Sequence, residues 1–147
     1  MGDLFQPWHL LVLWFVFSGF FVVPTIFYVL TLRRALANCA PTSRTLDSAM
    51  LWLLLVPVVG RIWHFFVVSG MANSLQNEFL RRNLPPEAER PGYSIGLAMC
   101  ICQVCAFIPG LGIAGLVLWI IYWSRVAEFS RRLESIPYTP VMTGSTL

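Results

Sequence analysis

One pattern occurs twice in this 147-residue chain. Each copy has a proline and a glycine three residues apart, then an apolar run, then a charged box; the copies are Val56-Pro57-x-x-Gly60 with Glu78-Phe79-x-Arg81-Arg82, and Ile108-Pro109-x-x-Gly112 with Glu128-Phe129-x-Arg131-Arg132. The Pro-x-x-Gly spacing interrupts a helix, because proline removes a backbone donor and glycine relaxes the backbone. The charged box marks the exit of a helix into water. The repeat therefore predicts two similar helical units.

The apolar content places those units in a membrane. Hydrophobic residues make up 57% of the chain and charged residues 12%, against averages of about 45–50% and about 25%. A domain of this length cannot bury so much apolar surface alone, so we expect a bilayer to cover part of it. No basic segment precedes the first apolar run, which favours a retained anchor over a cleaved signal peptide. We expect a multi-pass protein of a bacterial inner (plasma) membrane.

The predicted fold is an all-α integral membrane protein with about four membrane-inserted helices, one or more of them broken at Pro-x-x-Gly. A single helical domain covers residues 1–136, and a flexible tail covers 137–147. The predicted segments are 8–32, 48–82, 93–108 and 111–136. Pro24 lies inside the first segment, and Asp47 or Ser48 is a suitable N-cap for the second. Three prolines and a glycine make 83–92 a loop.

Two topologies compete for the run 49–72. A single span kinked at Pro57 gives a four-helix bundle with both termini on one side. We favour this model, because in the alternative the first leg, Asp47 to Val56, has ten residues and would reach only halfway across the hydrocarbon core. A re-entrant hairpin with its tip at Pro57–Gly60 instead puts every flanking arginine on one face, as the positive-inside rule prefers. The second unit, 93–126, fits a tight helical hairpin that turns at residues 109–112 and packs through Gly112 and Gly115.

The polar residues in the apolar runs are the candidate sites. Cys102 and Cys105 share a helix face and are weak candidates for a metal, although packing is the commoner role of such cysteines. His9 and His64 are weak candidates for binding a cofactor such as a pigment. Arg61 lies inside an apolar run, where a charge costs on the order of 2.5–3.5 kcal/mol and needs a compensating partner. Lipid or a partner chain is expected to contact Arg61, and also the box residues Arg81, Arg82, Arg131 and Arg132.

Two resemblances follow from particular residues. The first 13, Met1-Gly-Asp-Leu-Phe-Gln-Pro-Trp-His-Leu-Leu-Val-Leu13, are similar to the N-terminal anchor of twin-arginine translocase A-type proteins, and the likeness ends there. Residues 31–132 resemble an uncharacterised bacterial family of small polytopic membrane proteins. The motifs that carry this second resemblance are 36–45, Val56-Pro57-x-x-Gly60-x-x-Trp63-x-Phe65, Ser74-Leu75-x-x-Glu78-Phe79 and Trp119-Ile-Ile-Tyr122-Trp123. It implies an architecture and no activity.

No catalytic motif is present: the chain has no phosphate loop, nucleophile elbow or carboxylate pair at acid–base spacing. We therefore predict a non-enzyme, an accessory or structural subunit of a larger membrane complex, energy-transducing or otherwise. The alternative is a small homo-oligomeric channel or transporter. A membrane enzyme that uses the cysteines ranks third. The expected partners are membrane lipids and other membrane subunits, without nucleic acid; no cofactor is predicted, and a pigment or a lipid remains open as a ligand.

Overall fold

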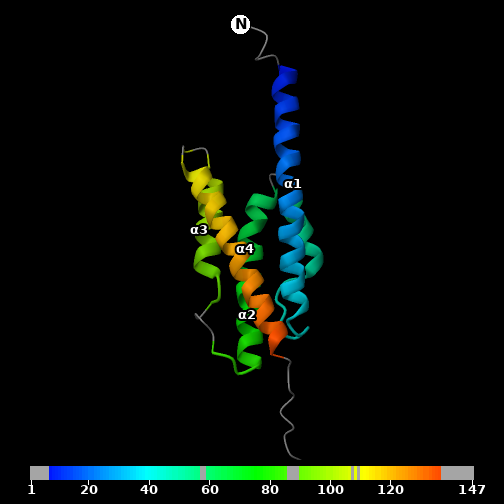
Figure 1. The fold of residues 1–147 in the computed structure, drawn as a ribbon, viewed down its shortest axis with the longest axis vertical. Helices are drawn as coiled ribbons and strands as arrows, with labels where there is room; N and C mark the ends of the chain where they lie inside the picture. Colours follow the sequence, from blue (N-terminus) through cyan, green and yellow to red (C-terminus); the bar gives the residue numbers. More distant parts are fainter. Residues whose placement is uncertain (1–6, 57–58, 86–89, 107, 109, 137–147) are drawn as a thin grey trace, which may run out of the picture.

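The structure is a computed structural model that describes residues 7–56, 59–85, 90–106, 108 and 110–136. Pro57, Pro109, residues 1–6 and the predicted tail over 137–147 lie outside the described residues. Within those ranges the chain is helical and has no strand. Its elements are α1 (Pro7–Ala37), the 3-10 helix η2 (Ser48–Leu55), α2 (Val59–Arg81), α3 (Tyr93–Val104) and α4 (Leu111–Ser135) (Figure 1).

The first helix is longer than its apolar run. The run ends at Arg33-Arg34, but α1 continues to Ala37, and Pro24 lies inside it without ending it. Asp47 then begins η2: its backbone is extended, and its carboxylate accepts from the Ala49 N–H at 3.0 Å. The N-cap predicted from the sequence is confirmed.

The run 49–72 forms a hairpin, so the kinked single span favoured above is wrong. Two hydrogen bonds and one close backbone approach show that η2, with Thr45 just before it, runs antiparallel to α2. Thr45 Oγ1 donates to the Gly70 carbonyl at 2.9 Å, and Trp63 Nε1 donates to the Met50 carbonyl at 2.9 Å. At the tip, a Cβ on Gly60 would lie 2.6 Å from the Leu54 carbonyl oxygen, so only glycine fits there.

The second unit, α3 and α4, is also a hairpin, as predicted. Gly115 lets the two helices approach, since a Cβ there would lie 3.3 Å from Cys102 Cβ. The two charged boxes meet at the same end of the molecule, where the rings of Phe79 and Phe129 are 6.0 Å apart and edge-to-face. The two boxes therefore lie on one face of the molecule.

Nearly all the arginines lie toward this end of the molecule, which we call the charged end. They sit in the last turns of α1, in the connector to η2, at the end of α2, in the α2–α3 loop and in the second half of α4 (Figure 1): Arg33, Arg34, Arg44, Arg81, Arg82, Arg90, Arg125, Arg131 and Arg132. The exception is Arg61, beside the tip of the first hairpin. We call that opposite end, with both hairpin tips, the apolar end.

The helices α1 and α4 run in the same direction and in register. Trp123 Nε1 donates to Thr31 Oγ1 at 2.9 Å, and Asn38 Nδ2 donates to Ser130 Oγ at 2.9 Å, both pairs 92 residues apart. The same offset puts Leu111, where α4 begins, level with Gly19. The preceding part of α1, about twelve residues or roughly 18 Å, therefore projects beyond the hairpin tips (Figure 1).

Apolar side chains cover much of the surface as well as the core. Large apolar side chains are exposed around α1, α2 and α4, including Val23, Ile62 and Ile113, the last at 74% exposure, whereas the Glu78 carboxylate is fully buried. The core between the helices contains Tyr28, Leu32, Leu51, Val67, Met71, Met99, Tyr122 and Leu133. Among the described residues one helix, Leu111–Ser135, is long and apolar enough to cross a membrane, and Tyr93–Val104 is apolar but shorter.

Candidate functional site

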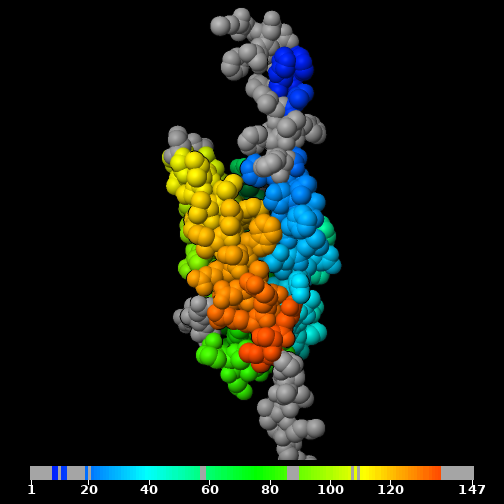
Figure 2. Space-filling model, in the orientation of Figure 1, coloured from blue at the N-terminus to red at the C-terminus, as the bar shows by residue number. Residues whose placement is uncertain are grey.

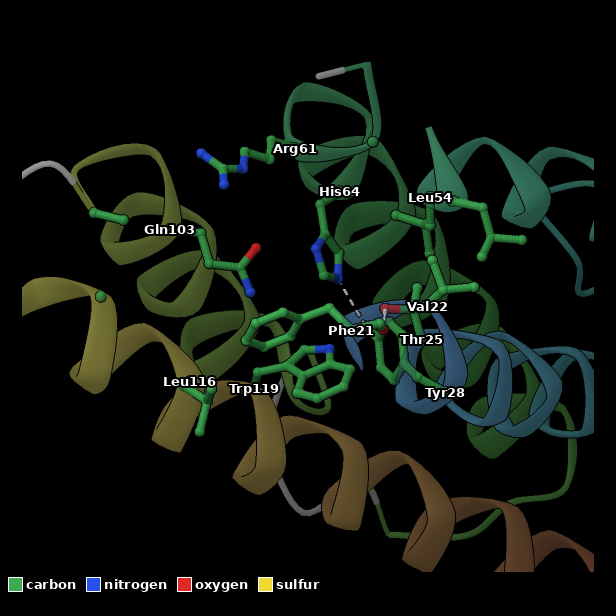
Figure 3. Close-up of a pocket in the computed structure, with 14 residues that line it drawn as sticks. Phe21, Val22, Thr25, Tyr28, Leu54, Arg61, His64, Gln103, Leu116 and Trp119 are labelled. Carbon is green, nitrogen blue, oxygen red and sulfur yellow. Dashed lines mark hydrogen bonds between the residues drawn. The ribbon is translucent and has the colours of Figure 1, made fainter. Parts of the chain in front are cut away.

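A cavity of about 530 Å³ lies between α1 and the tips of both hairpins. Figure 2 shows a notch in the surface here, between α1 and the tip of the α3–α4 hairpin. Both glycines of the repeated Pro-x-x-Gly pattern line the cavity. Its lining comes from α1 (Phe21, Val22, Thr25, Tyr28), from the first hairpin (Leu54, Leu55, Gly60, Arg61, His64) and from the second (Gln103, Ala106, Gly112, Leu116, Trp119) (Figure 3).

A row of three polar side chains crosses the inner side of the cavity. Tyr28 Oη and His64 Nε2 are 2.8 Å apart in a buried hydrogen bond between α1 and α2. Gln103 from α3 lies on the other side of the imidazole, with its carboxamide oxygen toward His64 and its nitrogen on the side of Phe21 and Trp119 (Figure 3). When Tyr28 donates to Nε2, the proton of the neutral imidazole is on Nδ1 and faces the Gln103 oxygen. The Gln103 N–H groups then remain available to a ligand.

Two further hydrogen-bond donors line the cavity. Arg61 is exposed at the rim, and neither a hydrogen bond nor an ion pair joins it to any described residue. The indole nitrogen of Trp119 lies on the edge of its ring on the side of Gln103 and His64 (Figure 3), and within the described ranges no group accepts from it. The Thr25 hydroxyl is already used, since it donates to the Phe21 carbonyl at 2.7 Å. The lining that the described residues form contains no carboxylate.

The cavity is closed toward the charged end. Tyr28 and His64 are 1% and 6% exposed, and directly beyond them Val29, Val67 and Val68 are almost fully buried. Between α1 and α4 the cavity is open to the surface, because its lining residues Phe21, Val22 and Leu116 are each about two-fifths exposed. A single chain therefore has a side pocket here rather than a continuous path from end to end.

The other candidates named from the sequence lie elsewhere. His9 stacks on Trp8 at 3.6 Å, in the projecting part of α1, and does not meet His64. Cys100 is buried, whereas Cys102 and Cys105 are half-buried on α3 and at its end, and Cys102 contacts the helix at Gly115. In the described part of the chain, no three His, Cys, Asp or Glu side chains come together as a group that could hold a metal ion.

The first charged box forms a second polar cluster, and it is internal. The fully buried Glu78 carboxylate accepts from Arg81, from Arg82 Nε at 2.6 Å and from the Ala40 N–H at 2.9 Å. Burial raises the pKa of Glu78, but these donors outweigh it and hold the pKa at about 2. The carboxylate is therefore ionised and paired throughout the physiological range.

Arg82 joins the ends of three helices. Its guanidinium donates to the carbonyls of Asn38 after α1, Leu133 in α4 and Ile136 after α4, at 2.6–2.9 Å. Its side chain is 10% exposed, so Arg82 uses its donors within the chain, and the expected contact with lipid or a partner chain stays a prediction. The sequence did not show this, because the second box has the same letters and is exposed: Glu128 and Arg132 pair at 2.7 Å with 39% and 48% exposure.

The cavity donors other than Arg61 were missed from the sequence. The available signal was Gln103, an amide inside the apolar run 93–108, where an unpaired polar group is costly. Comparisons with protein-family models, with curated proteins and with solved structures give no match, so the two resemblances drawn from sequence stay untested.

Proposed function

We propose that this chain is a multi-pass membrane protein in which α1 crosses the bilayer and both hairpins insert from the charged end. Residues 8–32 of α1 are about 37 Å long, enough for a hydrocarbon core of about 30 Å. By contrast, the eight residues of η2 and the twelve of α3 span only about 16 and 18 Å. The positive-inside rule then places the charged end in the cytoplasm. The apolar part of α2 ends at residue 72, so the Glu78 cluster lies outside the hydrocarbon.

We further propose that the protein is a non-catalytic accessory subunit of a membrane complex. The observation that carries this is the projecting part of α1, Pro7–Ser18, beside which no other described element lies (Figure 1). Trp8, Leu11 and Val12 are 52–60% exposed there. A helix that stands alone in one leaflet offers its whole circumference to a partner helix, which would pack against it as the hairpins pack against the rest of α1.

Mild-detergent purification with native electrophoresis tests this role. The wild-type chain should migrate with a large complex, and Leu11→Trp with Val12→Trp should release it by obstructing the helix contact. Val23→Trp is the matched control, because Val23 is equally exposed on α1 but lies level with the hairpins. A wild-type chain recovered only as a small free particle refutes the accessory role.

A homo-oligomeric channel or transporter is the second candidate, and the cavity favours it, since interrupted membrane helices are tolerated where they line a cavity. Flux of ions or solutes into liposomes, lost in Arg61→Ala, is the expected result. The closed inner side of the cavity means that a path would have to run between subunits. We rank this function below the accessory role for that reason.

A further inference from the structure

We infer that the cavity at the apolar end binds an amphiphile with an anionic head, a carboxylate or a phosphate. The head lies between Arg61 and Gln103, and the acyl chain leaves between α1 and α4. This inference rests on the membrane placement proposed above and is independent of the accessory role.

The polar groups of the cavity select an anion. Arg61 contributes a cation with five N–H donors, and Gln103 and Trp119 contribute neutral donors whose partners are missing among the described residues. Among the described residues no aspartate or glutamate lines the cavity. A site that has donors and one positive charge stabilises a head group made of acceptors, and guanidinium pairs with carboxylate or phosphate through two parallel hydrogen bonds.

The depth of Arg61 requires such a partner. Arg61 lies about one turn farther from the charged end than His64, which pairs with Tyr28 of α1, so it is roughly 12 Å from the level of Arg33. In the proposed placement, that depth is inside the hydrocarbon. It is the one charged side chain at the apolar end in the described part of the chain, so the described residues offer no counter-ion there. An unpaired charge at such a depth is costly, and an anionic ligand removes the cost.

The shape of the cavity fits a chain attached to that head. Its volume of about 530 Å³ lies within the range of roughly 300–1,000 Å³ for small-molecule sites. Val22 on α1 and Leu116 on α4 flank the side that opens to lipid, at 40% and 41% exposure. An acyl chain that leaves between them stays on apolar surface for its whole length. A small inorganic anion would leave this surface unused.

Quenching of Trp119 fluorescence by brominated chains provides the test. The full chain is placed in phosphatidylcholine nanodiscs and titrated with dibromostearate at a pH where the acid is ionised, or with dibrominated phosphatidylglycerol. We expect a saturable quenching component that Trp119→Phe abolishes. The acid and the phospholipid distinguish the two sources of an anionic head, and saturation by either one supports the site.

Charge variants then separate binding from partitioning. A hydrogen-bonded charge contributes the equivalent of about tenfold or more in affinity. Arg61→Gln should therefore raise the amphiphile concentration at half-saturation by that factor, and Arg61→Lys should raise it less. Arg125→Gln removes the same charge from an exposed site on α4 and should leave affinity unchanged. Arg61 makes no hydrogen bond or ion pair with a described residue, so unfolding of the variant is not expected, and its melting temperature verifies this.

Three results overturn the inference: no saturable component with either anionic amphiphile, equal binding of the methyl ester of dibromostearate, or wild-type affinity in Arg61→Gln. Each can occur while the chain still migrates with a large complex. Conversely, a chain that runs as a free particle but binds the acid retains the site and loses the accessory role. The two proposals therefore fail separately.

Discussion

The two charged boxes have the same sequence pattern and opposite environments, so equivalent substitutions should have very different effects. Glu78→Gln removes the charge of a fully buried carboxylate that accepts from Arg81, Arg82 and the Ala40 N–H. The substitution leaves the nearly buried Arg82 guanidinium without its ion-pair partner. Glu128→Gln makes the same chemical change on the surface of α4, where the carboxylate is 39% exposed.

The magnitude for Glu78 follows from its pKa. A fall from 4.5 to about 2 corresponds to about 3 kcal/mol, since one pKa unit is about 1.4 kcal/mol. This agrees with the range of roughly 3–5 kcal/mol for removing one partner of a buried ion pair. For Glu128, the exposed pair with Arg132 should contribute about 0–1 kcal/mol. The two variants should therefore differ by at least about 2 kcal/mol.

Thermal unfolding in one detergent measures the difference. For a chain of this length, 1 kcal/mol shifts the melting temperature by about 2–4 °C, so Glu78→Gln should melt roughly 6–12 °C below the wild type. Glu128→Gln should remain within a few degrees of it. Equal shifts in the two variants, or a wild-type melting temperature for Glu78→Gln, would refute the claim that the first box stabilises the charged end.

The same ion pairs predict a dependence on pH. The folded-state pKa of Glu78 lies below its ordinary value, so its contribution is complete above about pH 4.5 and is lost as the pH falls toward 2. The melting temperature of the wild type should therefore decline faster over this interval than that of Glu78→Gln. Parallel curves for the two proteins would contradict the assignment.

Four further predictions concern packing and sidedness. Gly96→Ala should cost about 1–3 kcal/mol, because the new Cβ would lie 2.5 Å from Val68 Cγ1. A Cβ at Gly112 would lie 3.7 Å from its nearest neighbour, the Ala106 carbonyl oxygen. Gly112→Ala should therefore change the free energy of unfolding by less than about 0.5 kcal/mol. Thr42→Cys, in the exposed connector, should react with an impermeant maleimide only after cells are opened. Cys39 should stay unlabelled until unfolding, because it is buried and because burial and the nearby Glu78 raise its thiol pKa to about 11.

The features of this fold that the sequence predicts are local ones. The Asp47 N-cap depends on a side chain two residues from its donor, and the hairpin at Gly112 depends on a turn between two apolar runs. The common placement of Glu78 and Glu128 at one end follows from the repeat. Two similar helical hairpins that insert from the same side both have their charged boxes on that side. Each of these inferences needs only neighbouring residues or a repeated spacing.

The features that the sequence does not predict depend on register between helices. Whether 49–72 bends or folds back is decided by contacts such as Trp63 with Met50, which no short pattern encodes. The burial of Glu78 depends on Asn38 and Leu133 arriving beside Arg82 from two other helices. The row Tyr28, His64 and Gln103 comes from three helices, each contributing one polar residue that appears isolated in its own run.

The repeat and the cavity are parts of one arrangement. Each Pro-x-x-Gly turn ends a hairpin, and since both hairpins run toward the same end, their tips meet against α1, with Gly60 and Gly112 both lining the space between them. The residues that follow these glycines differ: Arg61 follows the first, whereas Ile113, 74% exposed to the surroundings, follows the second. A symmetric pair of arginines would repel each other at this depth and leave two charges to neutralise. One arginine beside neutral donors leaves a single positive charge, which one carboxylate or phosphate head can balance.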